Sequence, residues 1–149
     1  LPIIFIALNK AVVPYYYENL KTKKLTISKI KTYVLFSIPI CISPSIIAMF
    51  LPNSIYTWFL GSAFGEAQYY VNFYLFGFGL NLPYLLLVNY FFYHGRSNLI
   101  TKVTFSSSII YLFFLYIFSQ VDLRFIPLAL TISNLYLISI FWKFINNEN

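Results

Sequence analysis

A lysine lies inside a run of apolar residues, where a charge is costly. Lys10 follows Asn9 within residues 1–17, and Tyr16 stands one or two helical turns further along. A charge at the centre of a bilayer costs about 2.5–3.5 kcal/mol on insertion scales. The position therefore indicates either a cation that binds an anionic ligand in a cavity, or a lysine whose long side chain reaches the nearby headgroups.

A second group of cations lies between two later apolar runs. His94, Gly95 and Arg96 form a short turn, and a further cation follows within two helical turns, at Lys102. These side chains suit a basic rim that meets a phosphate. They also suit a topology signal that contacts anionic lipids, so both interpretations stay open.

Hydroxyl, amide and aromatic hydroxyl groups line up at helical spacing along the apolar runs. Because lipid cannot form hydrogen bonds, we expect these stripes to face other helices or a wet cavity. Run by run, the stripes are Tyr70, Tyr74, Gly77, Asn81 and Tyr84, with Gln68, Asn72, Gly79 and Pro83 opposite; Thr101, Thr104, Ser108, Tyr111 and Ser119; Arg124, Pro127, Thr131 and Asn134; and Tyr33, Ser37, Cys41, Pro44 and Ser45.

Prolines interrupt three of these runs. Each one removes a backbone hydrogen bond and permits a kink. Kinked helices with polar stripes are frequent in transporters, although proline is also common in membrane helices in general. The interrupting residues are Pro14, Pro39, Pro44 and Pro83.

The sequence offers no constellation for enzyme catalysis, so we expect no catalytic residue and no cofactor. It has no paired carboxylates within an apolar run, no credible Ser-His-Asp set and no glycine-rich phosphate loop after a strand. Cys41 and His94 are each the single residue of their type, so we expect neither an internal disulfide nor a metal cluster. Glu66 and Asp122 stand at expected helix starts, where a carboxylate complements the helix dipole.

The bulk composition is that of a membrane protein. Of 149 residues, 60% are hydrophobic and 9% are charged, against about 25% charged residues in a soluble domain. A helix needs about 20 apolar residues to cross a bilayer. The runs are too long for strands and do not alternate, so we expect an all-α polytopic transmembrane bundle. It would contain the end of one helix and four full spans, at residues 1–17, 30–51, 67–93, 100–119 and 123–145.

Basic residues mark alternate connections between the runs. Four lysines lie within residues 18–29 and Arg96 lies two loops later, whereas residues 52–66 contain no lysine or arginine. The positive-inside rule then puts the first and third loops and the C-terminus in the cytoplasm. This pattern accounts for the formal net charge of +6, so we expect no nucleic-acid partner. The chain begins with Leu1 inside an apolar run, which indicates a fragment cut within a helix.

Four stretches of the sequence carry a family resemblance. They are ALNKAVVPYYYENL (7–20), FLPNSIYTWFLGSAFGEAQYYV (50–71), NYFFYHGRSNLITKVTFSSSIIYL (89–112) and IPLALTISNLYLI (126–138). In order, they resemble the end of the eighth helix, the outer loop and entry to the tenth, the tenth-to-eleventh turn, and the last helix of Wzx-like O-antigen flippases. This family belongs to the multidrug/oligosaccharidyl-lipid/polysaccharide exporter superfamily.

The resemblance implies a fold of about twelve helices in two lobes around a cavity, of which this chain would be the C-terminal part. Its partners would be the N-terminal lobe of the same transporter, membrane lipids and a lipid-linked oligosaccharide. It would flip an O-antigen or capsule repeat unit, carried on undecaprenyl pyrophosphate, from the inner to the outer leaflet of the bacterial inner membrane in polysaccharide (lipopolysaccharide) biosynthesis. Cations, hydroxyls and amides suit that headgroup, so the candidate substrate-binding residues are Lys10, Tyr74, Asn81, Arg96 and Lys102.

Three alternatives remain open. An O-antigen polymerase or ligase, which is a membrane glycosyltransferase, would rely on a large outer loop carrying Arg and His. The longest outer loop expected here, residues 52–66, has neither, which disfavours that enzyme. A drug exporter of the same superfamily and a membrane scaffold without a transported substrate are the other two.

Overall fold

The computed structural model describes residues 2–61, 63 and 67–148, and within them the chain is helical, with no strand. This confirms the predicted all-α class. Leu1 and Glu66 lie outside the described residues. The expectation that the Glu66 carboxylate stands at a helix start therefore stays a prediction. The elements are α1 (Pro2–Lys21), α2 (Ile27–Phe50), α3 (Asn53–Leu60), α4 (Ala67–Gly79), α5 (Asn81–Tyr93), α6 (Ser97–Val121), the 3₁₀ turn η2 (Leu123–Phe125) and α7 (Ile126–Asn146).

Four helical stretches of the described chain are long and apolar enough to cross a membrane. They are Ile27–Phe50, Ala67–Tyr93, Ser97–Val121 and Leu123–Asn146. The predicted runs begin and end within about one helical turn of these bounds. Some helices begin before the predicted apolar run, because their first turn contains polar residues. At the start of α2, for example, the Thr26 hydroxyl accepts a hydrogen bond from the Lys29 amide at 3.5 Å.

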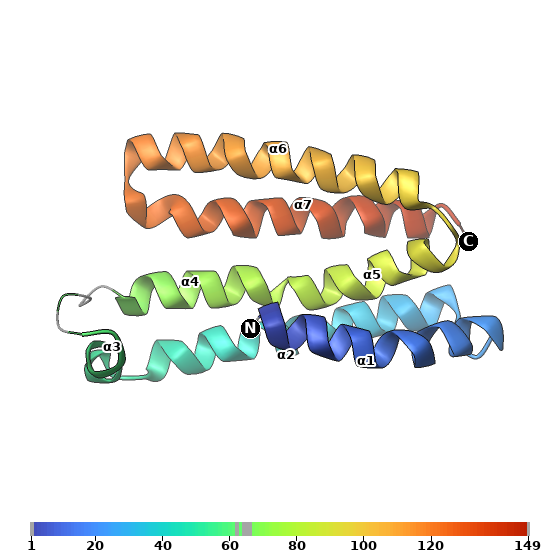
Figure 1. Cartoon of the computed structure of the whole chain (residues 1–149), viewed down its shortest axis with the longest axis horizontal. Coiled ribbons are helices and arrows are strands. Elements are labelled where there is room, and N and C mark those ends of the chain that lie inside the picture. Colours follow the sequence, from blue (N-terminus) through green and yellow to red (C-terminus); the bar gives the residue numbers. More distant parts are fainter. Residues whose placement is uncertain (1, 62, 64–66, 149) are drawn as a thin grey trace.

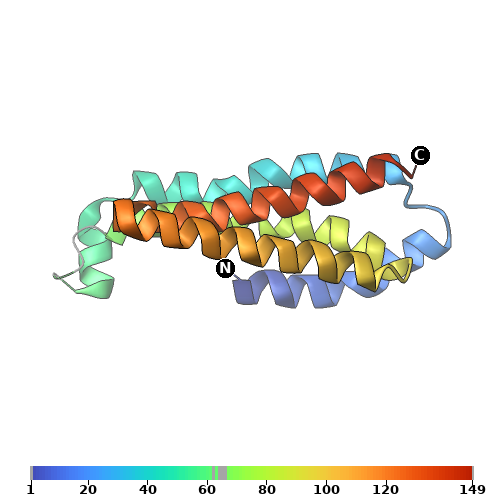
Figure 2. The same ribbon diagram turned by 90° about the horizontal axis from the view of Figure 1, so that it is seen from above.

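The span formed by α4 and α5 lies at the centre of the bundle (Figure 1). It packs against α2 on one side and α7 on the other, while α6 packs on α7 and α1 lies against α5. Figures 1 and 2 place the C-terminus at the end of the bundle that carries the α1–α2 and α5–α6 turns. Since these turns hold Lys23, Lys24 and Arg96, we call this the basic end.

The central span is broken at Leu80, between α4 and α5. The amide of Leu80 bonds to Phe76 and that of Tyr84 bonds to Leu80, each over a long 3.4 Å. Pro83 has no N–H group, so the Gly79 carbonyl loses the donor that a regular helix would supply. The sequence predicted an interruption at Pro83, and the helix breaks one turn before it.

The other interrupting prolines do not divide their helices: Pro14 lies inside α1, and Pro39 and Pro44 lie inside α2. Pro44 leaves the carbonyl of Ile40 without its helical donor. The hydroxyl of Ser43 donates to that oxygen at 2.8 Å and so replaces the missing amide.

The helix break brings α4 very close to α2. A Cβ atom built on Gly79 would lie 2.3 Å from the carbonyl oxygen of Cys41, a distance that no real side chain adopts. Glycine is therefore required where the two backbones cross, because any side chain there would push α2 away.

The apolar core lies toward the basic end, where α2, α5 and α7 meet. Its largest fully buried side chains are Phe91 and Phe141, whose ring centroids are 5.3 Å apart. Ile30, Leu87 and Ile145 are also fully buried around them. This packing fixes α5 against α7, and so fixes the turn that follows α5.

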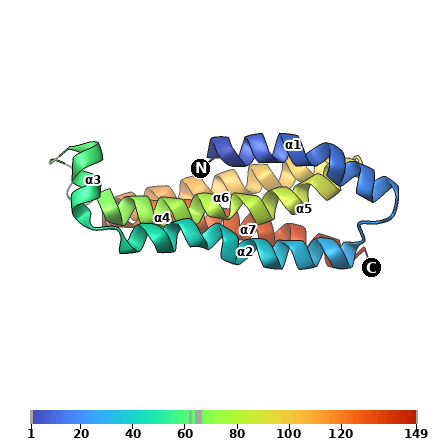
Figure 3. The same cartoon turned by 90° about the horizontal axis from the view of Figure 1, so that it is seen from below.

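The loop predicted at residues 52–66 contains a helix, α3, which sequence analysis missed. Figure 3 shows it lying crosswise at the end of the bundle opposite the basic end. The Tyr56 hydroxyl donates to the Ala48 carbonyl at 2.7 Å and fixes α3 to α2. Trp58 and Phe59 are exposed, as is typical of aromatic residues at a membrane interface.

Candidate functional site

Polar side chains join α7 to the centre of the bundle beside the helix break. The Asn134 side-chain amide donates to the carbonyl of Gly77 at 2.9 Å in a buried position. Ser107 of α6 donates to the carbonyl of Ser133 at 3.0 Å, again buried. Thr131 is also buried, and its hydroxyl has no hydrogen-bond partner among the described residues. We call this set of contacts the polar seam.

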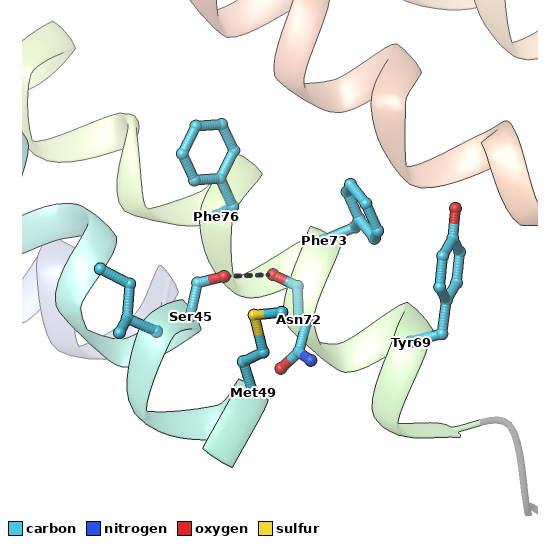
Figure 4. A pocket seen from close by; sticks show the side chains of 7 residues that line it. Ser45, Met49, Tyr69, Asn72, Phe73 and Phe76 are labelled. Carbon is cyan, nitrogen blue, oxygen red and sulfur yellow. Dashed lines mark hydrogen bonds between the residues drawn. The ribbon is translucent and has the colours of Figure 1, made fainter.

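The two opposite polar faces predicted for residues 67–93 meet two different neighbours. One face meets α2: Gly79 lies against Cys41, and the Ser45 hydroxyl donates to the Asn72 carbonyl at 2.9 Å (Figure 4). The other face meets α7, through Gly77. The expectation that polar stripes face other helices is correct for this span.

Three residues of the polar stripe predicted on α6 face away from the rest of the described chain, whereas Thr104 and Tyr111 of the same stripe are half-buried. Thr101, Ser108 and Ser119 are exposed, and each hydroxyl donates to a carbonyl of its own helix, at 3.0, 3.1 and 2.7 Å. The hydroxyl of Thr104, which belongs to the predicted stripe, is buried, and so is that of Ser107, which the stripe omitted. Three consecutive serines at 106–108 allowed either choice of face.

The candidates Tyr74 and Asn81 lie on either side of the helix break. Asn81 is half-buried, and its side-chain amide donates to the carbonyl of Phe78 at 3.1 Å. Tyr74 is half-buried, and its ring stacks on Phe78 with centroids 6.0 Å apart. Asn81 therefore bridges the break, whereas the Tyr74 contact lies within α4.

Lys10 lies on an exposed face of α1, while its neighbour Asn9 turns toward the bundle. The Asn89 side-chain amide donates to the Asn9 side-chain oxygen at 2.7 Å. Asn89 is buried on α5, so this pair links α1 to the central span, as does the Tyr16 hydroxyl, which donates to the Leu86 carbonyl at 2.9 Å. Sequence analysis did not single out Asn89, because a lone amide in an apolar run has no partner visible in the sequence.

The turn that carries Arg96 is built by a helix C-cap. The Arg96 amide donates to Phe91 at 2.9 Å and the Gly95 amide to Phe92 at 3.0 Å, which is the Schellman pattern. Gly95 takes a φ of 68°, a left-handed conformation that glycine adopts without strain. The backbone of Arg96 is thus fixed at the start of α6.

Arg96 pairs with Glu148, a residue near the C-terminus that sequence analysis assigned no role. The guanidinium contacts one carboxylate oxygen of Glu148, and the Tyr90 hydroxyl donates to the other at 2.6 Å. Lys102, six residues after Arg96 and so nearly two turns further along α6, is exposed. The predicted basic rim therefore contains a carboxylate as well as cations.

The structure does not gather the candidate residues into one site. Asn81 and Tyr93 stand at opposite ends of α5, a separation of about 18 Å at the helical rise. Tyr74 and Asn81 thus belong to the helix break, whereas Arg96 and Lys102 belong to the basic end. Among the described residues, no group of three or more His, Cys, Asp or Glu side chains could hold a metal ion.

Two open cavities flank these regions. One, of about 490 Å³, lies between α2 and α4 and is lined mainly by apolar side chains around Ser45 and Asn72 (Figure 4). The other, of about 560 Å³, lies at the basic end between the α1–α2 turn and α5. Its lining is more polar and includes Lys23, Thr26, Ser28, Tyr90 and His94.

Curated proteins of Haemophilus influenzae are similar to this chain. "Lsg locus putative protein 1" is 39% identical over 136 residues, which are 91% of this chain and 34% of that protein. A protein named "Uncharacterized membrane protein" is 34% identical over 143 residues, 96% of this chain and 35% of that protein. The chain spans about a third of the length of these relatives.

No family model matches the chain, and no solved structure matches it. One relative is named as a membrane protein, and four helices of the described chain are able to cross a bilayer. The chain is therefore a multi-pass α-helical membrane protein.

Proposed function

We propose that the chain is the C-terminal part of an inner-membrane transporter that flips an undecaprenyl-pyrophosphate-linked oligosaccharide to the outer leaflet, and that it is not an enzyme. The observation that carries this proposal is the broken central span, with polar contacts to the helices on both sides of it. The N-terminal lobe of the same protein would supply the other wall of the substrate cavity, and the C-terminus would be cytoplasmic.

A break in the middle of a span suits transport. Leu80 lies at the midpoint of the 27-residue span Ala67–Tyr93, so irregular backbone falls near the bilayer centre. Membrane proteins tolerate such backbone where it is buried in protein or lines a cavity. Transporters place substrate sites at discontinuous helices of this kind.

The relatives and the sequence support the choice of substrate. One relative is named as a putative protein of the Lsg locus. The resemblance to Wzx-like flippases points to a lipid-linked sugar. The basic end would receive the anionic headgroup, since Lys23, His94 and Arg96 lie near one another there.

The test is complementation with the full-length protein in a bacterial strain that lacks its own flippase. We expect surface polysaccharide to return and lipid-linked repeat units to stop accumulating on the inner leaflet. A strain that lacks its polymerase serves as the matched control and should not be rescued. Rescue of the polymerase strain alone, seen as restored chain length of the surface polysaccharide, would contradict the proposal in favour of the enzyme.

A further inference from the structure

The carboxylate of Glu148 occupies a group of donors that two other helices provide. The Tyr90 hydroxyl on α5 donates to one oxygen at 2.6 Å, and the Arg96 guanidinium at the start of α6 contacts the other. Tyr90 is 6% exposed, so its side chain has a fixed position within the packed bundle. We call Tyr90 and Arg96 the anion seat.

Contacts that do not involve Glu148 hold the Tyr90 ring and the Arg96 backbone of the anion seat. The ring of Tyr90 contacts Phe91 and His94, with centroids 5.4 and 4.3 Å away. The Nδ1 atom of His94 also lies 2.9 Å from the Tyr90 carbonyl oxygen. The Schellman cap fixes the backbone of Arg96. These contacts would persist if the carboxylate left.

The segment that carries Glu148 lies outside the helices that provide the anion seat. Glu148 lies two residues beyond the end of α7, and Asn146 and Asn147 before it are exposed. The Glu148 side chain is 14% exposed, whereas that of Arg96 is 48% exposed. The guanidinium is therefore the more accessible partner of the pair, so an incoming anion can reach it before it displaces the Glu148 carboxylate.

The anion seat adjoins the cavity at the basic end. Tyr90 and His94 line this cavity of about 560 Å³ from one side, and Lys23, Thr26 and Ser28 line it from the other. Cationic and hydroxyl donors that converge on open space are suited to phosphate oxygens, with which they form charge-assisted hydrogen bonds. A carboxylate that accepts from Tyr90 and Arg96 is the simplest chemical stand-in for such an oxyanion.

We propose that this cavity is a diphosphate-binding site, and that Glu148 is an internal competitor that must leave the anion seat before a diphosphate can occupy it. The anion chemistry stands on the geometry alone. The assignment of the diphosphate to a lipid carrier rests on the proposed function. Displacement of Glu148 would couple arrival of the headgroup to release of the segment after α7 from Tyr90 and Arg96.

The experiment measures binding by the full-length protein in nanodiscs of neutral phosphatidylcholine. The probes are farnesyl diphosphate, inorganic diphosphate and farnesol. We expect Glu148→Gln to tighten farnesyl diphosphate binding by about tenfold, because the competing charge is gone. Arg96→Gln in the Glu148→Gln background should remove that gain, and Tyr90→Phe should weaken binding. Glu18→Gln, which changes an exposed carboxylate of α1, is the matched control and should have no effect.

Each outcome decides the proposal or the source of the ligand. Unchanged or weaker binding in Glu148→Gln, with lower thermal stability, would show that the pair only holds the helices together, and the proposal would be wrong. Glu148→Ala removes the same competitor and repeats the test if Glu148→Gln does not fold. Competition by farnesol, which has no phosphate, would also overturn it. Equal binding of both diphosphates would uphold the site and assign it to soluble phosphate.

The binding test fails or succeeds independently of transport. If complementation fails while Glu148→Gln still tightens diphosphate binding, the site stands and the flippase proposal does not. If complementation succeeds while Glu148→Gln leaves binding unchanged, the reverse holds.

Discussion

Polar side chains in this bundle behave differently at its centre and on its outward face. At the polar seam, Asn134 and Ser107 bond to the backbone of a different helix. On the outward face of α6, Thr101, Ser108 and Ser119 bond to carbonyls of their own helix. Among the hydroxyls, Ser107 differs from these three in its burial and in its partner.

This difference distinguishes polar residues that pack one helix against another from polar residues on a surface that the described chain leaves uncovered. A hydroxyl that bonds within its own helix hides its polarity, so it can face lipid or protein at little cost. An amide such as that of Asn134 cannot do this as easily, and its burial needs a partner on another helix. The spacing of polar residues therefore does not identify a site until the hydrogen-bond partners are known.

The comparison depends first on the placement of the helices across the membrane, where we expect an all-or-none result. A cysteine introduced at Asn53, beside α3, should react with a membrane-impermeant maleimide on intact cells. Cysteines at Thr22 and Ser97, at the basic end, should react only after permeabilisation, because basic loops stay in the cytoplasm. Cys41 is buried, and the chain without an added cysteine gives the background. Equal labelling of Thr22 and Asn53 on intact cells would refute the topology.

The largest expected effect on stability is at the crossing of α2 and α4. Gly79→Ala should lower the free energy of unfolding by about 3 kcal/mol, the upper end of the usual cost of overpacking. The added Cβ would lie 2.3 Å from a backbone oxygen, which cannot move without moving α2. Thermal unfolding of the purified protein in detergent measures the change.

Gly77→Ala is the matched control for this substitution. Its Cβ would lie 3.1 Å from the Leu130 side chain, whose terminal methyl group can shift. We expect a cost of about 1 kcal/mol or less. If the two alanine variants were equally stable, the backbone crossing would not be the tight point of the fold.

A smaller effect should separate the polar seam from the outward face directly. Asn134→Ala removes the hydrogen bond to Gly77 and should cost about 1 kcal/mol, within the range measured for such bonds in membrane proteins. Ser108→Ala removes only a bond within α6 and should change stability by less than about 0.5 kcal/mol. A Ser108→Ala cost as large as that of Asn134→Ala would abolish the distinction.

The sequence alone was sufficient for the spans, because length and hydrophobicity decide them. It also identified both faces of the central span and the positions of Thr131 and Asn134, which helical periodicity determines. It could not say which proline breaks a helix, since the outcome depends on whether a hydroxyl such as that of Ser43 replaces the missing donor.

Long-range partners were out of reach of the sequence. Glu148 pairs with Arg96 and Tyr90, which stand more than fifty residues earlier, and no local pattern links them. Asn89 likewise finds its partner in Asn9. The helix α3 was missed because its eight residues lack the length on which span prediction depends. Sequence patterns thus identify polar residues that could form a site, and only the tertiary structure shows which residues they contact.

The smallest effect we predict concerns Lys10, which belongs to the outward surface. Its side chain is exposed, while Asn9 beside it bonds to Asn89 and fixes the rotation of α1. The position of Asn9 therefore turns Lys10 away from the packed bundle, toward lipid or toward the cavity that the rest of the transporter would complete.

Transport by the full-length protein decides between those two environments. If Lys10 meets the headgroup, Lys10→Ala should lower export of the lipid-linked saccharide by about threefold, which corresponds to the ~0.2–1 kcal/mol of an exposed ion pair. Lys10→Arg should retain most of the export, because either cation can donate to phosphate oxygens. A lysine that only reaches the lipid headgroups predicts instead that alanine removes an insertion cost and leaves export unchanged. The measurement is steady-state surface polysaccharide, normalised to the amount of protein in the membrane, with Lys21→Ala at the end of α1 as the control. Wild-type export in Lys10→Ala, or an equal loss in Lys21→Ala, would make Lys10 a membrane anchor and leave the outward face of α1 to the lipid.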